Sequence, residues 1–395
     1  MPLVFVHGVA NRMGDDYRAG VTTQDAMFRQ FLLAGHRPVP GPSVRIRNPY
    51  WGDFGGRLAW NGASLPLEDF EALGSDDAPF LALHASALPE GRVDAANQAV
   101  LLVARRSLQD AVDLLWSASA LVAGDEADAL AALAVPARAY AVANPRPAWV
   151  TEVRNDDELV ARLEREVAGF AGGAADTPEE PEDWEALGGF NPWQPVRRGV
   201  ARLRGAVTNV VGQEAAERIR PAAIPSVANF LGDVFVYLRQ QDGVARRIGD
   251  LVEGDLRAAA AEASPEDPLV VVAHSMGGNI AYDLLTSSAA DVTVDLYVTV
   301  GTQVGFFEEL KLFTSSRADM PGADPRRKVP RPPNIRRWIN VFDYSDLLGF
   351  EVGSIVEGVD DFVYRTGSLF KAHSQYFLQP GFHERLAARV RGGPR

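Results

Sequence analysis

Four short runs of apolar residues lack the alternation of apolar and polar positions that marks a half-exposed strand. They cover residues 3–6, 269–273, 294–300 and 338–342. A strand that is buried on both faces has this pattern, and such strands are typical of parallel sheets. We therefore expect four buried strands, one near the start of the chain and three in its last third.

A helical pattern fills the space between the second and third runs. Within residues 276–285, Ala281, Leu284 and Leu285 fall on the side that would face inward. A strand, a helix and a strand in that order form a βαβ unit, which places the two strands parallel in one sheet. The sequence therefore predicts an α/β fold with a mostly parallel sheet.

The middle of the chain, from about residue 55 to about 225, contains few strand patterns and many helical ones. One helix is expected over 156–170 with Asn155 as its cap. Residues 172–195 are rich in Gly, Pro and acidic residues and indicate an exposed loop, and helical patterns return at 227–238 and 244–263. One helical stripe of small or apolar residues comprises Leu101, Ala104, Leu108, Val112, Leu115, Ser119 and Val122.

These patterns predict one α/β domain over residues 1–395, built from both ends of the chain, with a helical insertion at 55–225. An amphipathic helix normally turns its apolar face to the interior, which favours packing of these helices on the core. The alternative is a cap over the active site. The sequence does not predict an oligomeric state.

Composition narrows the partners and the compartment. The 395 residues carry 52 acidic and 39 basic side chains, a net charge of −13, which disfavours a nucleic-acid partner. The absence of cysteine excludes disulfides, thiolate metal sites and a cysteine nucleophile. No signal peptide or long apolar span is visible, so we expect a soluble cytoplasmic protein. Three lysines against 36 arginines suggest a GC-rich bacterial genome.

The segment with the clearest chemistry is Ala-His-Ser-Met-Gly-Gly at 273–278. An apolar run precedes it and a helical pattern follows it, as in the G-x-S-x-G turn that exposes a nucleophilic serine. Ala273 takes the place of the first glycine, and Gly277 stands in the expected position. A phosphate-binding loop would need Gly-x-Gly or Gly-Lys-Ser/Thr, which this turn lacks. We predict Ser275 as the nucleophile and His274 as a packed structural residue.

This turn resembles the nucleophile turn of small bacterial lipases, which also carry alanine in the first position. Residues 3–9 (Leu-Val-Phe-Val-His-Gly-Val) are similar to the His-Gly loop that follows an early strand in those enzymes. The resemblance covers the two ends of the chain and not the helical middle, and it implies an α/β-hydrolase fold. It also implies an oxyanion hole formed by the backbone amides of Val9 and Met276.

A second, smaller likeness concerns the lipid nature of the substrate. Gly232-Asp233-Val234 with Tyr237, followed by helix, strand and nucleophile turn, is similar to intracellular phospholipases of the DDHD type. This resemblance implies a lipid substrate.

The base must follow the serine and the acid, because the triad order in this fold is Ser, Asp or Glu, then His. Only His373 and His383 follow Ser275. His373 lies in an expected loop, whereas His383 lies at the expected start of the last helix, where a histidine is usually solvated. We predict His373 as the base, with His383 as the alternative.

The acid is predicted in the turn after the fourth apolar run. Asp346 lies a few residues beyond that run and ahead of an apolar residue, as in the family that the turn resembles. Asp343 is the alternative, although a residue at a strand end more often bonds the turn backbone. Asp360 and Asp361 are later candidates with no strand pattern before them.

These residues together predict a serine esterase that forms an acyl-enzyme intermediate and needs no cofactor or metal ion. The resemblance favours lipid or acyl esters as substrates, with contact to a membrane surface as an option. A thioesterase or amidase could use the same triad. The competing class is a catalytically inactive scaffold that binds a partner or a small ligand.

Overall fold

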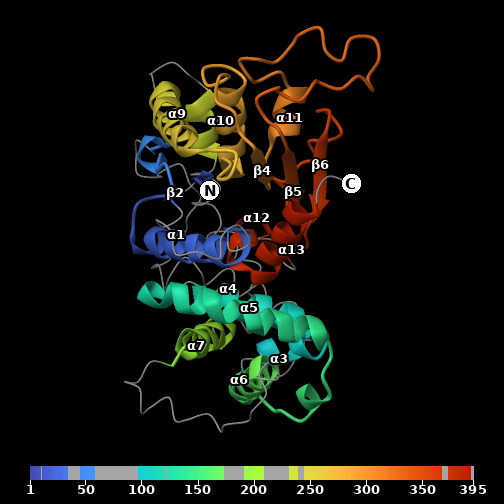
Figure 1. Ribbon diagram of the computed structural model, residues 1–395. Coiled ribbons are helices and arrows are strands. Elements are labelled where there is room, and N and C mark those ends of the chain that lie inside the picture. The colour runs from blue at the N-terminus through green and yellow to red at the C-terminus, as the bar shows by residue number, and fades with distance from the viewer. Residues whose placement is uncertain are drawn as a thin grey trace, which may run out of the picture.

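The computed structural model describes most of the chain as a layered α/β structure (Figure 1). One sheet lies between two layers of helices, and a further group of helices lies beyond one of these layers. The described residues are 1–9, 11–33, 45–57, 97–120, 122–172, 191–208, 231–238, 244–366 and 372–392. Among them, no helix is both long and apolar enough to cross a membrane.

The sheet has six strands in the order β2-β1-β3-β4-β5-β6, and every neighbouring pair is parallel. The predicted α/β class with a parallel sheet is therefore confirmed. The strands are β1 (Leu3–Val6), β2 (Ile46–Arg47), β3 (Val270–His274), β4 (Leu296–Val300), β5 (Trp338–Phe342) and β6 (Val359–Val363).

Four of these strands match the four apolar runs, because each is buried on both faces. Side chains alternate between the two helix layers along each strand. On β1, Val4 and Val6 pack with one buried cluster, and Leu3 and Phe5 pack with the other. The two edge strands, β2 and β6, were not predicted.

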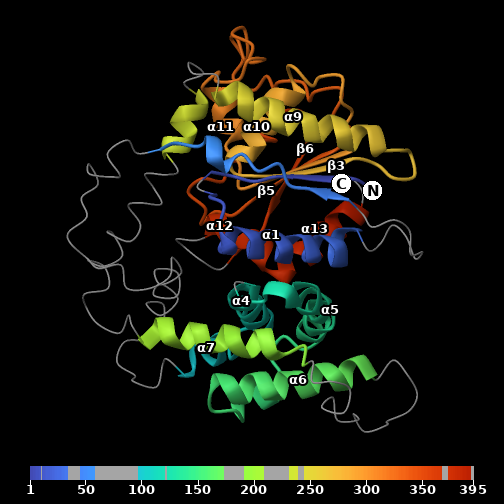
Figure 2. The same ribbon diagram turned by 90° about the vertical axis from the view of Figure 1, so that its left-hand side faces the viewer.

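Helices cover both faces of the sheet. α9, α10 and α11 lie on one face, and α1, α12 and α13 lie on the other (Figure 2). Their bounds are α1 (Asp15–Met27), α9 (Val244–Glu262), α10 (Met276–Leu285), α11 (Val304–Glu309), α12 (Ala372–Gln375) and α13 (Pro380–Arg391). Two short helical segments extend this set, η1 (Phe28–Leu33) after α1 and η7 (Tyr376–Leu378) before α13.

The strand order reverses its direction between β1 and β3. The chain first adds β2 on one side of β1 and then returns to place β3 on the other side, after which the sheet grows outward. In open parallel sheets, such a reversal leaves a crevice at the carboxyl ends of the two strands, where ligands bind. Here the His-Gly loop follows β1 and Ser275 follows β3, so both predicted motifs lie at the carboxyl ends of these two strands.

The described part of the predicted insertion beyond residue 97 is helical. It packs below the layer of α1 and α13 (Figures 1 and 2). Its helices are α3 (Ala99–Ala104), α4 (Leu108–Ala120), α5 (Ala127–Ala143), α6 (Asp156–Gly172) and α7 (Gln194–Thr208). The segments 58–96, 173–190 and 209–230 lie outside the described residues.

Two details of the helix prediction differ from the structure. The single stripe over 101–122 is divided between α3 and α4, which are separated at residues 105–107. The predicted loop at 172–195 lies mostly outside the described residues, and its last two residues already belong to α7. The cap on α6 is as predicted, since Asn155 Oδ1 accepts a hydrogen bond from Glu158 N–H (2.9 Å).

The apolar face of α4 is fully buried. Leu108, Val112 and Leu115 lie in a cluster that is built almost entirely from α3, α4, α5, α6 and α7. This cluster is a hydrophobic core separate from the two that flank the sheet. The predicted single domain with a helical insertion, and the alternative of a cap over the active site, both stay predictions.

Candidate functional site

The backbone turns sharply at Ser275, between β3 and α10. Its φ of 53° and ψ of −131° lie in a region that residues with a side chain rarely occupy. Ser275 N–H donates to the Val300 carbonyl oxygen on β4 (3.0 Å), which ties the turn to the sheet. A Cβ at Gly277 would lie 2.2 Å from the Val6 carbonyl oxygen, so glycine allows α10 to start this close to β1.

His373 lies on the short helix α12 and not in the predicted loop, and it reaches the serine directly. Its Nε2 lies 2.7 Å from Ser275 Oγ, which is a hydrogen-bond distance. The Ser275 residue is only 1% exposed, whereas the His373 side chain is 21% exposed. The histidine is therefore the member of this pair that meets solvent.

Asp346, in the turn after β5, binds the opposite side of the imidazole. Its carboxylate oxygens lie 3.0 and 3.1 Å from His373 Nδ1. The Tyr376 hydroxyl (2.9 Å) and Leu348 N–H (2.9 Å) also donate to this carboxylate. Because Nδ1–H donates to Asp346, Nε2 is left as the acceptor for the Ser275 hydroxyl proton.

Hydrogen bonds keep the Asp346 carboxyl ionised, and a neighbouring glycine leaves space for its oxygens. Burial acts to raise the pKa of Asp346, but hydrogen bonds from His373, Leu348 and Tyr376 outweigh burial and hold that pKa below its ordinary value. Gly301 has a φ of 56°, and a Cβ there would lie 2.8 Å from Asp346 Oδ2. Glycine is thus required at this position both for the backbone and for the carboxylate.

Asp343, the alternative acid, bonds the turn backbone instead, as a residue at a strand end is expected to do. Its Oδ1 accepts from Ser345 N–H (2.9 Å). Its Oδ2 accepts from both the N–H (2.6 Å) and the hydroxyl (2.8 Å) of Thr366. These bonds hold the turn that carries Asp346.

Asp360 and Asp361, which were expected to have no strand before them, themselves lie within β6. Asp360 forms an ion pair with Arg389 on α13 (2.7 Å to Nε). Asp361 accepts from the Asn340 amide (2.8 Å) on the neighbouring strand. Both carboxylates therefore secure the edge of the sheet.

His383, the alternative base, is buried and not solvated as predicted. Its ring packs edge-on against Phe28 and Phe382, and its Nε2 lies 2.9 Å from the Phe377 carbonyl oxygen. The first turn of α13 faces the core, which the sequence pattern did not reveal. Burial lowers the pKa of His383 to about 4, so this ring is neutral and donates to Phe377.

The two segments predicted to supply oxyanion-hole amides lie next to Ser275. A Cβ at Gly8 would lie 2.7 Å from Ser275 Cβ and 3.3 Å from Ser275 Oγ, so the loop that carries Val9 passes directly beside the serine. Met276 is the first residue of α10, and the amides of a first helical turn have no acceptor within the helix. The positive end of the helix dipole adds to the attraction for an anion there.

Two buried side chains hold the site in ways that the motifs did not predict. His274 Nε2 donates to the His373 carbonyl oxygen (2.6 Å), so the residue before Ser275 fixes the backbone of His373. Gln303 Nε2 donates to the Leu348 carbonyl oxygen (2.6 Å), and its Oε1 accepts from Asn279 (3.0 Å). Tyr376, which binds Asp346, also supports the site. It follows His373 by three residues, and this spacing is the one sign of a supporting residue that the sequence offered.

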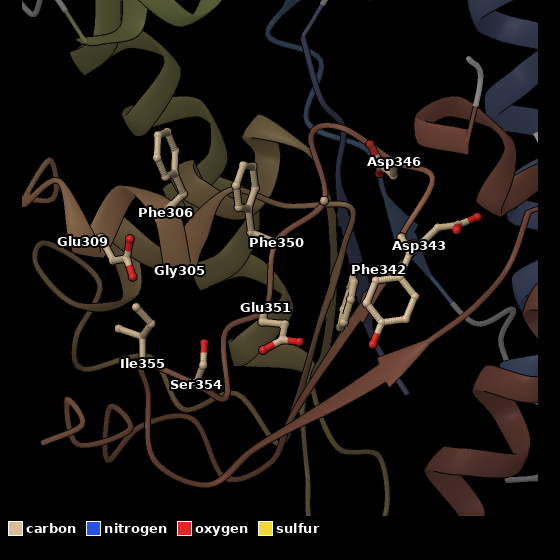
Figure 3. A pocket seen from close by; sticks show the side chains of 12 residues that line it. Gly305, Phe306, Glu309, Phe342, Asp343, Asp346, Phe350, Glu351, Ser354 and Ile355 are labelled. Carbon is tan, nitrogen blue, oxygen red and sulfur yellow. The ribbon is translucent and has the colours of Figure 1, made fainter. Parts of the chain in front are cut away.

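A pocket of about 350 Å³ lies against the turn after β5 that carries Asp346 (Figure 3). Its walls come from α11 and from the segment between β5 and β6. Asp346 lines it, but neither Ser275 nor His373 does, so the pocket is separate from the Ser275–His373 pair. The aromatic side chains in its wall are Phe306, Phe342, Tyr344 and Phe350.

Comparison with other proteins adds no family assignment. No protein-family model matches this chain, and neither the curated proteins nor the solved structures gave a match. Within the ranges that the structure describes, no group of three or more His, Asp or Glu side chains could hold a metal ion. The function must therefore be argued from the geometry of the site.

Proposed function

We propose that this protein is a serine hydrolase with an α/β-hydrolase fold that cleaves carboxylic esters. The observation that carries the proposal is the backbone of Ser275, held at a φ of 53° with its Oγ 2.7 Å from His373 Nε2. A strained serine on a strand-to-helix turn is costly to maintain, and it serves to present the hydroxyl to a base and a substrate. A phosphate-binding turn would not need a histidine at this distance.

The residues divide the reaction between them. His373 takes the proton from Ser275 Oγ as that oxygen attacks the ester carbonyl, and Asp346 stabilises the imidazolium that forms. The amides of Val9 and Met276 receive the negative charge on the carbonyl oxygen. His373 then gives its proton to the leaving alcohol, and the acyl group remains on Ser275. Water, activated by the same histidine, releases the acid and restores the serine.

A lipid or acyl ester is the substrate class that we propose. Arg12, in the loop after β1, forms an ion pair with Asp233 (2.7 Å), which places the helix at 231–238 beside this loop. Apolar side chains are exposed there and on the turn after β5, on two sides of the nucleophile. They are Met13, Phe235, Tyr344 and Leu347. An acyl chain or a lipid surface would cover such side chains, which supports both the substrate class and the proposed membrane contact.

Hydrolysis of p-nitrophenyl esters of increasing acyl length tests the proposal. Ser275→Ala should abolish turnover, because no other group replaces the nucleophile. His373→Ala should lower kcat by at least about 1000-fold. His383→Gln is the matched control and should retain kcat per folded molecule. An inactive scaffold predicts no turnover by the wild type, and a loss of turnover only in His383→Gln would reassign the base.

A further inference from the structure

The peptide group between Gly8 and Val9 is held on one side by two side chains. The Gly8 carbonyl oxygen accepts a hydrogen bond from His7 Nδ1 (2.7 Å) and another from Asn11 Nδ2 (2.9 Å). The Asn11 amide also donates to the Val9 carbonyl oxygen (3.3 Å). Because this end of the Asn11 side-chain amide faces two carbonyl oxygens, it must be the NH₂ group and not the amide oxygen.

The protonation of His7 is equally well defined. Its Nε2 accepts the Trp51 backbone N–H (3.2 Å), so the ring proton must be on Nδ1, where it is donated to Gly8. The Trp51 indole stacks on the His7 imidazole with ring centres 5.0 Å apart. Burial lowers the pKa of His7 to about 4, which keeps the ring neutral at and well below neutral pH. The donor to Gly8 is therefore constant over that range.

Asn11 is itself fixed in place. Its backbone carbonyl oxygen accepts from Arg12 Nη1 (3.1 Å), and the Arg12 guanidinium binds both carboxylate oxygens of the buried Asp233. A Cβ at Gly52 would lie 2.0 Å from the Asn11 carbonyl oxygen, so the segment after β2 presses against the same residue. An anchored donor restricts its acceptor more than a mobile one does.

The direction of one carbonyl sets the direction of the next amide. A trans peptide is planar, and its N–H points opposite to its C=O. With the Gly8 oxygen held toward His7 and Asn11, the Val9 N–H points away from them, while the Gly8 backbone lies against Ser275. We infer that Asn11, acting with His7, is a positioning residue that aims the Val9 amide at the oxyanion formed on Ser275. This inference rests on the proposed function.

Two substitutions of Asn11 test the inference. Asn11→Leu removes the donor at similar volume, and Asn11→Asp keeps the shape but turns an acceptor toward two carbonyl oxygens. Loss of a complete oxyanion donor costs about 100- to 1000-fold in kcat, so a misdirected one should cost about 10- to 100-fold. KM should change little, because the oxyanion forms only after the substrate has bound.

Binding of a trifluoromethyl ketone gives a readout that a purely structural role would not move. The ketone forms a tetrahedral adduct with the serine, so its affinity should fall by the same factor as kcat/KM in both variants. Asn48→Leu is the matched control, since Asn48 donates to the Asp25 carboxylate (3.2 Å) in the same part of the fold. It should leave kcat and ketone affinity unchanged. Asn11→Ser, a smaller donor, replaces either variant that fails to fold and should show a smaller loss.

Two other results would have distinct meanings. Variants with a lower melting temperature but wild-type kcat and ketone affinity per folded molecule would overturn the positioning role and leave the proposed function intact. A wild-type protein that neither hydrolyses esters nor binds the ketone would overturn the proposed function, and this inference with it.

Discussion

Asp343 and Asp346 lie three residues apart and are both buried, yet they bind different partners. Asp343 accepts backbone and hydroxyl hydrogens from Ser345 and Thr366. Asp346 faces His373 Nδ1 at 3.0 Å. A carboxylate in that position selects the imidazole tautomer and stabilises the imidazolium. At the scale of the residue, the hydrogen-bond partners separate a structural carboxylate from the acid of the proposed triad.

Asp346→Asn should therefore lower kcat by about 10⁴-fold, because an amide N–H facing Nδ1 favours the wrong tautomer. Asp343→Asn is the matched control. It should keep kcat within a few-fold but lower the free energy of unfolding by about 1–3 kcal/mol, since the buried donors lose a charged acceptor. Steady-state kinetics and urea unfolding measure both quantities. The opposite pattern would assign the acid to Asp343.

At the scale of the element, buried charged side chains link α4 and α5 to α13, one of the helices that cover the sheet. Arg138 on α5 lies 2.9 Å from Glu384 on α13 and 3.6 Å from Asp113 on α4. Asp113 also accepts Gly381 N–H (2.9 Å) at the start of α13. The Arg138 side chain is only 3% exposed. Burial raises the pKa of Asp113 to about 6, although Arg138 opposes this, so Asp113 is ionised above that pH.

Asp113→Ala should lower the free energy of unfolding at pH 7.5 by about 3–5 kcal/mol, because it leaves a buried guanidinium without this partner. Asp291→Ala is the control, since Asp291 lies closer to its partner Arg257 (2.7 and 3.0 Å) than Asp113 does to Arg138, but both of its pair's side chains are well exposed. Its cost should stay below about 1 kcal/mol. Equal costs in urea unfolding would show that the buried network does not fasten the insertion.

The strands that could be predicted are those whose environment leaves a clear pattern. β3 and β5 are buried on both faces and read as mostly apolar runs, in which the polar residues are His274 at the end of β3 and Asn340 within β5. β6 reads Val-Asp-Asp-Phe-Val and lies at the edge, where Asp360 and Asp361 bind partners that folding brings from elsewhere. β2 has only two residues, too few for any periodicity. Edge strands are thus fixed by tertiary contacts that a local pattern does not contain.

At the scale of the whole molecule, the site joins three distant segments of the chain. Chain order, the turn motif, an expected loop at His373 and the family resemblance together selected Ser275, His373 and Asp346, which the fold brings within hydrogen-bond distance. The supporting bonds could not be predicted in this way. His274 binds a carbonyl 99 residues away, and Trp51 binds the ring of His7 from 44 residues away. Such contacts depend on the complete fold.

Buried titratable groups make the stability of the whole molecule depend on pH. Burial lowers the pKa of His7 to about 4, that of His274 to about 3 and that of His383 to about 4. Below pH 6.5 the unfolded chain binds protons that the folded one does not, so these groups lower stability as pH falls. Burial raises the pKa of three carboxyls to about 6, which acts in the opposite direction: Asp25, Asp113 and Asp156.

A single histidine variant separates these opposing effects. His383→Gln removes one group whose folded pKa is about 4, while leaving the carboxyls in place. The stability advantage of wild type over this variant should shrink by roughly 2 kcal/mol between pH 7 and pH 5. Urea unfolding at each pH measures the difference. A constant difference would mean that His383 takes up a proton in the folded protein as readily as in the unfolded chain.

Labelling with a fluorophosphonate probe tests the central claim most directly, because only an activated serine reacts with it at an appreciable rate. The proposed function predicts a single adduct per chain, mapped by peptide mass spectrometry to Ser275. It also predicts no adduct on Ser275→Ala and much slower labelling of His373→Ala. An unlabelled wild type, or an adduct that persists on Ser275→Ala, would contradict the assignment of Ser275 as the nucleophile.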